Sequence, residues 1–259
     1  MVIPTLNESL NLIHVLPHLP AWIHELIIVD GRSNDDTVEV ARRLWPDVVV
    51  VFEERPGKGA ALRAGFTAAT GDIVVTLDAD GSMSPDEIST FVGALMSGAD
   101  YVKGSRFIQG AGTGDMGVLR RSGNLGLTLL VRAGFGGRFS DLCYGYNAFW
   151  RSTLPALDLD GDGFEIETLM NIRAITAGLR VAEIPSFEAP RVHGQSNLRT
   201  FADGWRVLRT ILREWRSASS RPTRRALPRT AAEPVIDLRE HAASAPLAPT
   251  PEPDVALDQ

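Results

Sequence analysis

The chain has 259 residues, of which 44% are hydrophobic and 22% charged, and its formal net charge is −6 at pH 7. This length and apolar content suit one sizeable domain with a tail, and the acidic balance leaves no electrostatic footprint for nucleic acid. The single cysteine, Cys143, excludes an internal disulfide framework, and no Cys/His cluster has zinc-site spacing. The sequence lacks both a run of about 18 apolar residues and a signal-peptide pattern. We therefore expect a cytoplasmic protein, soluble or peripheral at the inner face of the membrane.

Strands and helices alternate in the first part of the chain. Apolar runs predict strands that end near residues 5, 30, 52 and 77, separated by helices at about 10–16, 37–44 and 60–69. The nearly continuous apolar run at 25–29 is typical of a strand that is covered on both faces. The fold class is therefore α/β: a doubly wound, mostly parallel sheet with helices on both faces, whose ligands bind at the carboxyl ends of the strands.

The second part of the chain continues with longer connections. We expect a helix at 85–97, a strand at 99–107, a mobile glycine-rich loop at 109–117, a helix at 119–133, an aromatic stretch at 141–150, a helix at 164–178, a strand at 180–187 and a last helix at 200–216. Beyond it, Ala, Pro, Ser and Arg dominate and large apolar residues are too few to offset the entropy of ordering. The predicted organisation is one domain over 1–200, a basic amphipathic helix over 201–216 and a disordered tail over 217–259.

Two carboxylates follow the fourth predicted strand. Asp78 and Asp80 are separated by one residue, and in an extended chain residues i and i+2 share a side. Together they could hold one hard cation, whose shell water and phosphate oxygens would complete. The competing interpretation is a pair of loop aspartates before the helix that begins at Ser84-Pro85.

Two glycine-rich segments look like nucleotide-binding motifs but are poorly placed. Residues 112–117 match G-x-G-x-x-G, yet they do not follow the first strand of a βαβ unit or open a helix there. The segment 57–59 lacks the spacing and the Ser/Thr of a phosphate-binding P-loop, and we expect Lys58 to be a solvated loop lysine, with approach to a ligand as the alternative.

Five motifs in order resemble the inverting glycosyltransferases of family 2, which have the GT-A fold, and especially the branch that acts on dolichyl or polyprenyl phosphate. The motifs are Val-Ile-Pro-Thr-Leu-Asn-Glu at 2–8, Ile-Val-Asp-Gly-Arg-Ser at 28–33, Leu-Asp-Ala-Asp-Gly-Ser at 77–82, Gly-Ser-Arg at 104–106 and Arg-Val-His-Gly-Gln-Ser-Asn-Leu at 191–198.

This resemblance implies a nucleotide diphosphate-sugar donor and a divalent metal, Mg²⁺ or Mn²⁺. It assigns the metal to Asp78 and Asp80. The residues that it implies for donor binding are Pro4, Thr5, Asn7, Glu8, Asp30, Asp78, Ala79, Arg191 and Ser196. Two positions depart from the pattern, because the branch commonly has Gln where this chain has Ser82 and Lys where it has Asn197.

The resemblance also implies an acceptor site. Arg106 and Arg120 would meet an acceptor phosphate, and Asn124 stands where the family often has Ser. A hydroxyl acceptor needs a general base, for which Asp141 and Glu165 are the candidates, whereas an ionised phosphate needs none. We expect Asp80, Asp141 and Arg106 to be the catalytic residues.

The last predicted helix gives a separate indication. Phe201, Trp205, Leu208, Leu212 and Trp215 recur at helical spacing, and four arginines occupy the other positions. The pattern suits a helix in an anionic membrane interface, and equally an ordinary helix that packs on the domain with a basic face exposed.

The function that we expect is transfer of a hexose from a GDP- or UDP-sugar to a polyprenyl phosphate. One alternative keeps this chemistry with a hydroxyl acceptor. Two others are a sugar nucleotidyltransferase, which would need a glycine-rich first loop that residues 4–8 lack, and a non-catalytic protein that binds nucleotide-sugars.

Overall fold

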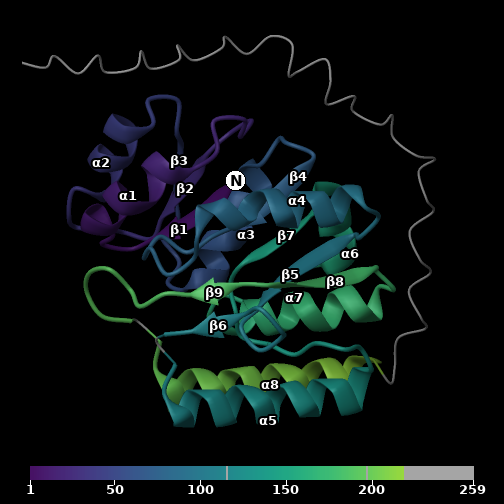
Figure 1. Ribbon diagram of the computed structural model, residues 1–259. Coiled ribbons are helices and arrows are strands. Elements are labelled where there is room, and N and C mark those ends of the chain that lie inside the picture. Colours follow the sequence, from purple (N-terminus) through teal and green to yellow (C-terminus); the bar gives the residue numbers. More distant parts are fainter. Residues whose placement is uncertain (115, 197, 219–259) are drawn as a thin grey trace, which may run out of the picture. The chain divides into compact units, whose positions relative to one another are not determined.

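The fold is that of a computed structural model, in which residues 1–114, 116–196 and 198–218 are described (Figure 1). The strands are β1 (Val2–Thr5), β2 (Ile27–Asp30), β3 (Val49–Phe52), β4 (Ile73–Thr76), β5 (Tyr101–Ser105), β6 (Gly112–Thr113), β7 (Asn147–Trp150), β8 (Val181–Pro185) and β9 (Phe187–Glu188). The α-helices are α1 (Ser9–Val15), α2 (Thr37–Leu44), α3 (Lys58–Ala68), α4 (Ile88–Met96), α5 (Val118–Phe135), α6 (Leu154–Leu157), α7 (Glu165–Thr176) and α8 (Thr200–Ala218).

The main sheet of the described chain has the order β3-β2-β1-β4-β7-β5-β8. All neighbouring pairs are parallel except those of β7, which runs antiparallel to β4 and β5. The chain leaves β1 for β2 on one side and later returns to β4 on the other. The carboxyl ends of β1 and β4 therefore form the switch point of the sheet, where open α/β sheets bind ligands.

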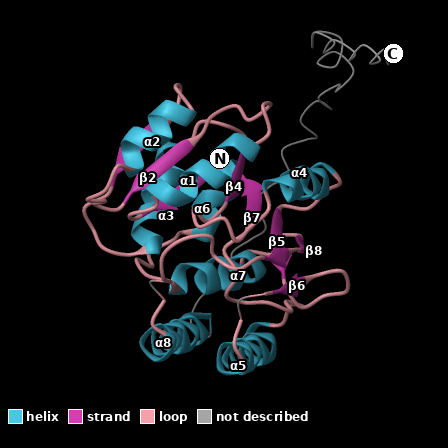
Figure 2. Cartoon of the chain, turned by 60° about the vertical axis from the view of Figure 1, so that its left-hand side comes forward, coloured by secondary structure: helices cyan, strands magenta, loops and turns pink. Residues whose placement is uncertain are grey.

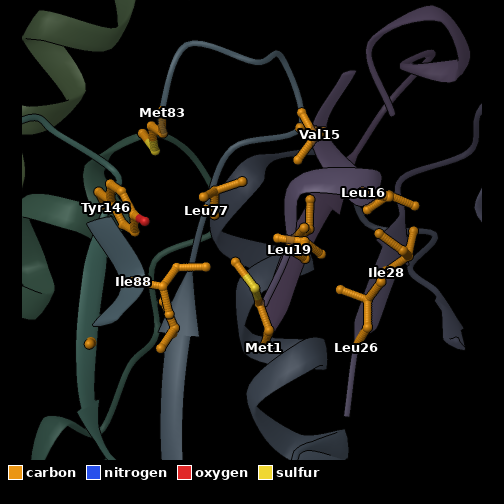
Figure 3. Packing of buried hydrophobic residues seen from close by; sticks show 14 of the residues in the cluster. Met1, Val15, Leu16, Leu19, Leu26, Ile28, Leu77, Met83, Ile88 and Tyr146 are labelled. Atoms are coloured by element: carbon orange, nitrogen blue, oxygen red, sulfur yellow. The ribbon is translucent and has the colours of Figure 1, made fainter. Parts of the chain in front are cut away.

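Alternate side chains of the strands feed two cores. Ile3, Ile28 and Val75 pack with α1, α2 and α4 on one face, whereas Val2 and Val74 pack with α3 and α7 on the other. Figure 3 shows part of the first core, in which Leu16 and Ile28 lie beside Leu26. Both faces of the strands are apolar, as the nearly continuous hydrophobic runs predict.

Helices α5 and α8 form an additional layer outside α7, and they lie side by side in both Figure 1 and Figure 2. Their shared core contains Val131 of α5, Ile172 of α7, and Val207 and Ile211 of α8. The face of α8 that packs on the domain therefore carries Val207 and Ile211, whereas Phe201, Trp205 and Trp215 are exposed.

The structure changes the predicted elements in three places. The predicted helix at 85–97 begins with a 3₁₀ turn at Pro85–Glu87. Within the loop expected to be mobile, β6 pairs in parallel with β9 through Gly112–Phe187 and Thr113–Glu188. Helix α8 continues to Ala218, past the predicted end at 216, while residues 219–259 of the predicted tail lie outside the described residues. Among described helices, none has the length and apolar character needed to cross a membrane.

Candidate active site

A cavity of about 380 Å³ opens at the switch point of the sheet. Its wall comes from segments that are far apart in the sequence: the end of β1, the loop after β4, the start of α3, the chain before β7, and the facing parts of α5 and α8. Lining residues that were expected to act are Pro4, Thr5, Glu8, Asp78, Ala79, Asp80, Arg106, Arg120, Asn124, Arg191 and Ser196. The fold therefore brings most of the predicted site together.

The loop after β4 presents both aspartates to this cavity. Oδ1 of Asp80 accepts hydrogen bonds from the backbone N–H of Ser82 (3.0 Å) and from its hydroxyl (2.7 Å), which leaves Oδ2 directed elsewhere. Gly81 makes the turn possible, since its φ is +78° and a Cβ there would lie 2.7 Å from Val192. Ser82, which replaces the usual Gln, thus orients Asp80 through a local turn.

Asp78 is paired with a buried lysine. Nζ of Lys58 lies 2.6 Å from Oδ1 of Asp78 and 2.5 Å from Oε1 of Glu167 on α7. Burial raises the pKa of Asp78 to about 6, helped by the nearby charges of Asp80 and Glu167 and opposed by Lys58. The expectation of a solvated Lys58 was wrong, because α3 begins at this residue and carries the side chain under the cavity, where only 11% of it is exposed.

Arg191 ties the loop after β9 to the opposite side of the cavity. Its guanidinium donates to Oε1 of Glu8 and, at 3.3 Å, to Oδ2 of Asp80. The backbone N–H of Val192 donates to the carbonyl of Asp80 (3.1 Å), and that of Ala189 donates to the carbonyl of Ser82 (2.8 Å). The loop is therefore fixed directly against the aspartate turn.

The donor set at this point fits a divalent cation that is shared with a substrate. The cluster contains four carboxylates (Glu8, Asp78, Asp80 and Glu167) and two cations (Lys58 and Arg191), which leaves two negative charges when all are ionised. No group of three or more His, Cys, Asp or Glu side chains in the described segments is arranged to hold a metal. Protein oxygens alone would thus form only part of a shell, as is usual for Mg²⁺ on phosphate substrates.

The nucleotide end of the predicted site is only partly exposed to the cavity. Pro4 and Thr5 line it, together with Gly31 and Arg32, which follow β2. Asp30 is buried at 3% exposure, and its Oδ1 has no hydrogen-bond partner while Oδ2 accepts from the N–H of Ser33. Asp30 itself is not part of the cavity wall, but it directly precedes Gly31, which is, and its unpaired oxygen could accept a ligand N–H or hydroxyl.

Asn7, which was expected to bind the donor, instead bonds a neighbouring loop. Its Oδ1 accepts from the backbone N–H of Asn34 (2.9 Å), and its own N–H donates to Ser33 (2.8 Å). The residue is not part of the cavity wall. Its visible role is to join the loop after β1 to the loop after β2.

The acceptor residues expected around Arg106 form one buried network. Nε and Nη2 of Arg106 donate to the two oxygens of Asp141 at 2.6 and 2.9 Å, and Nδ2 of Asn124 donates to Oδ1 of Asp141 at 3.0 Å. Asp141 has no exposed surface, and although burial acts against it, the hydrogen bonds and charge of Arg106 lower its pKa. This geometry favours Asp141 as the holder of Arg106 over Asp141 as a general base.

Glu165, the other candidate base, is also engaged. Its Oε1 accepts from the backbone N–H groups of Asp162 and Gly163 at 3.1 and 2.9 Å. Its Oε2 has no hydrogen-bond partner and lies 3.9 Å from Nε of Arg206, and the residue is outside the cavity wall. Glu165 thus fixes the turn at residues 162–163 that leads into its own helix.

Sequence reasoning missed two carboxylates of the site, Glu167 and Glu188. Glu167 lies in helix α7, which also carries the buried polar residues Glu165, Asn171 and Arg173, so its place in the sequence did not single it out. Glu188 accepts from Nη1 of Arg106 (2.9 Å) and from the hydroxyl of Thr113 (2.6 Å). It belongs to a strand of two residues, which no pattern in the sequence predicted.

Comparisons with known proteins point to one family. The model of "Glycosyl transferase family 2" matches residues 1–155. An uncharacterized glycosyltransferase of Mycobacterium tuberculosis is 34% identical over 218 residues, which cover 80% of this chain and 96% of the relative. The polyprenol monophosphomannose synthase of Mycolicibacterium smegmatis is 32% identical, covering 76% of this chain and 80% of that protein.

A solved structure supports the same fold. The glucosyl-3-phosphoglycerate synthase of M. tuberculosis, in complex with Mn²⁺, UDP and glucosyl-3-phosphoglycerate, superposes with a TM-score of 0.64 at 26% identity. The match covers 85% of this chain and 79% of that chain. The GT-A fold expected from the motifs is thereby confirmed.

Proposed function

Because the chain belongs to glycosyltransferase family 2, we propose that it transfers a hexose from a nucleotide diphosphate-sugar to a polyprenyl phosphate, with Mg²⁺ or Mn²⁺ on the diphosphate. The observation that carries this proposal is the continuity of the cavity. Its wall runs from Asp80 to Leu119 and Leu127 of α5 and Val207 of α8. One space thus adjoins both a charged donor region and an apolar gap between two helices.

The donor end has the chemistry that a metal diphosphate requires. Asp78 and Asp80 would hold the cation, which neutralises charge on the departing nucleotide diphosphate when bound. Arg191 is placed to exchange its contacts with Glu8 and Asp80 for diphosphate oxygens. The orphan oxygen of Asp30 would receive a hydrogen from the ribose or the base.

The acceptor end favours a group that needs no base. In an inverting transfer an acceptor oxygen forms its bond to the anomeric carbon while the bond from that carbon to the diphosphate oxygen breaks on the opposite face. A phosphate is already ionised at neutral pH, so no proton has to be removed. This agrees with the sealed position of Asp141, which has no surface from which to accept a proton.

The outer faces of α5 and α8 support a lipid as the carrier of that phosphate. Large apolar side chains are exposed along both helices, namely Val118, Leu119, Leu125 and Leu129 on α5 and Phe201, Trp205 and Trp215 on α8. Arginines 121, 132, 209 and 216 are exposed on the same two helices. Apolar residues flanked by arginines suit an anionic membrane interface, where a polyprenyl chain would enter the cavity directly.

One alternative keeps the donor chemistry and changes the acceptor. The name of the structural neighbour assigns it to phosphoglycerate, a small soluble phosphate compound. Such an acceptor would use the same arginines but would have no use for the exposed apolar faces. A hydroxyl acceptor would in addition need a base that the buried Asp141 does not readily supply.

The test is a donor screen with the full chain. GDP- and UDP-hexoses are incubated with Mn²⁺ or Mg²⁺, and nucleotide release is followed with and without a short-chain polyprenyl phosphate. We expect release that depends on both the metal and the lipid phosphate. Release that requires phosphoglycerate instead, or that requires no acceptor phosphate at all, would refute the lipid acceptor.

A further inference from the structure

The acceptor arginine is already neutralised by the chain itself. Arg106 is almost completely buried, and its guanidinium bonds two carboxylates, Asp141 through Nε and Nη2 and Glu188 through Nη1. Lys103 is also buried within electrostatic range of Asp141, and Arg120 lines the same cavity, but Arg106 itself has two carboxylate partners before any acceptor binds. A phosphate would therefore have to compete with one of these carboxylates for the guanidinium of Arg106.

The two carboxylates are not equivalent. Asp141 is wholly buried and accepts further hydrogen bonds from Asn124 and from the backbone N–H of Arg106 at 3.2 Å, so it is fixed. Glu188 lines the cavity together with Arg106, and 13% of its side chain is exposed. Of these two partners of Arg106, Glu188 is the one that an incoming anion can reach.

The backbone of Glu188 is held independently of its side chain. Its carbonyl accepts from the N–H of Gly114 (2.8 Å), and the next residue, Ala189, donates to Ser82 (2.8 Å). Within the part of the chain that the structure describes, the carboxylate accepts from Arg106 and from the hydroxyl of Thr113. Exchange of this carboxylate for another anion thus requires a side-chain rotation and no movement of the strand.

We propose that Glu188 is a specificity-determining residue that occupies the phosphate position on Arg106 and must be displaced by the phosphate monoester of the acceptor. A phosphate monoester carries between one and two negative charges and accepts more hydrogen bonds than a carboxylate, so it can replace Glu188. A neutral acceptor cannot replace it. Glu188 thereby restricts binding at Arg106 to strongly charged acceptors. The inference rests on the proposed phosphate acceptor, but the ligand chemistry is shared by lipid and soluble phosphates.

The experiment compares the full chain with Glu188→Gln, which keeps the shape of the side chain and removes its charge. Dissociation constants are measured by calorimetry for farnesyl phosphate, farnesol and glycerol 3-phosphate. We expect farnesyl phosphate to bind about tenfold more tightly to the variant, since a like charge at contact distance is removed. Binding of farnesol should not change. A general loosening of the site would instead weaken both lipids.

Glu87→Gln is the matched control. Glu87 accepts from the hydroxyl of Ser186 and from the N–H of Phe187, so it holds β9 without touching Arg106. It should not tighten phosphate binding. A second variant, Thr113→Val, keeps the charge of Glu188 but removes the hydroxyl that donates to it, and it should tighten farnesyl phosphate by a smaller factor.

The outcomes separate this inference from the proposed function. Tighter binding of glycerol 3-phosphate, with farnesyl phosphate no better than farnesol, would support the role of Glu188 and refute the lipid acceptor. Turnover with farnesyl phosphate, but unchanged or weaker phosphate binding in both the Glu188→Gln and Thr113→Val variants, would overturn the role of Glu188. Failure of either phosphate to bind any form of the protein would overturn both.

Discussion

Replacing Lys58 with methionine tests whether the site is held together by its buried ion pairs. Met keeps an unbranched apolar chain but leaves Asp78 and Glu167 without the cation between them. We expect the free energy of unfolding at pH 8 to fall by about 3 kcal/mol, because removing one partner of a buried pair leaves uncompensated charge. The expected change is therefore large for a single side chain on the wall of an open cavity.

The magnitude follows from the geometry. Contacts of 2.6 and 2.5 Å and side-chain exposures of 11% for Lys58 and 5% for Glu167 place the pair among buried ones, for which the loss is about 3–5 kcal/mol. Asp78 is 27% exposed and its pKa is already about 6, so it can take up a proton and limit the loss. We therefore expect a loss in the free energy of unfolding at the lower end of this range, about 3 kcal/mol.

The sign of the pH dependence is a further check. A carboxyl whose pKa is raised in the folded state binds more protons folded than unfolded, so stability falls as pH rises through the window between the two pKa values. In the variant the pKa of Asp78 rises further than its value of about 6, so the pH window over which stability falls extends upward. The difference between wild type and Lys58→Met should thus be smaller at pH 5 than at pH 8.

Urea unfolding followed by tryptophan fluorescence measures these differences. Glu167→Gln and the double variant complete a cycle, and the double variant should lose clearly less than the two single losses combined. Arg55→Met is the control, because the side chain of Arg55 is exposed to solvent and its pair with Glu53 should contribute little to stability. A Lys58→Met loss no larger than that of the control, or additive single losses, would refute the reasoning.

Three other expectations follow from the same geometry. Asp80→Ala should lower metal-dependent turnover by about a hundredfold or more while leaving the urea midpoint within the range of surface variants, and wild-type Mn²⁺ affinity and turnover would remove Asp80 from the site. Burial, together with Glu167 and Asp141, raises the pKa of Cys143 to about 12, so alkylation by iodoacetamide at pH 8 should be on the order of a thousandfold slower in the folded than in the unfolded chain, and equal rates would contradict this. Gly145→Ala should destabilise by about 1–3 kcal/mol, because a Cβ would lie 2.5 Å from Nζ of Lys58 and 2.7 Å from Oε1 of Glu167, whereas Gly93→Ala in α4, with nothing within 4 Å, should not destabilise.

Local patterns were enough to predict the main fold. The strands that form β1, β2 and β4 are apolar on both faces, and each stands before a polar turn, so their parallel arrangement and shared carboxyl edge followed from the sequence. The carboxylate pair and the closing arginine lie where the motifs placed them, around one cavity. What local patterns could not supply was the partner of each charge.

Those partners come from long-range contacts that no local spacing encodes. Lys58 was expected to be a solvated loop lysine because its segment lacks the pattern of a P-loop, yet it pairs with Glu167, which is 109 residues away. Asp141 was a candidate base for the case of a hydroxyl acceptor, and the structure buries it against Arg106. A short strand of two residues placed Glu188 on the other side of the same arginine.

Three cations of the described site share one arrangement. Lys58, Arg191 and Arg106 each bond two carboxylates, so each of these direct pairings holds one more carboxylate than cation. Buried ion pairs contribute little to net stability even when the charges balance, and an excess makes the balance worse. An arrangement of this kind is explained by what the ligands bring: a divalent cation compensates the carboxylates, and phosphates take over the freed N–H groups. The residues whose excess charge destabilises the ligand-free fold are therefore those that a bound donor and acceptor would neutralise.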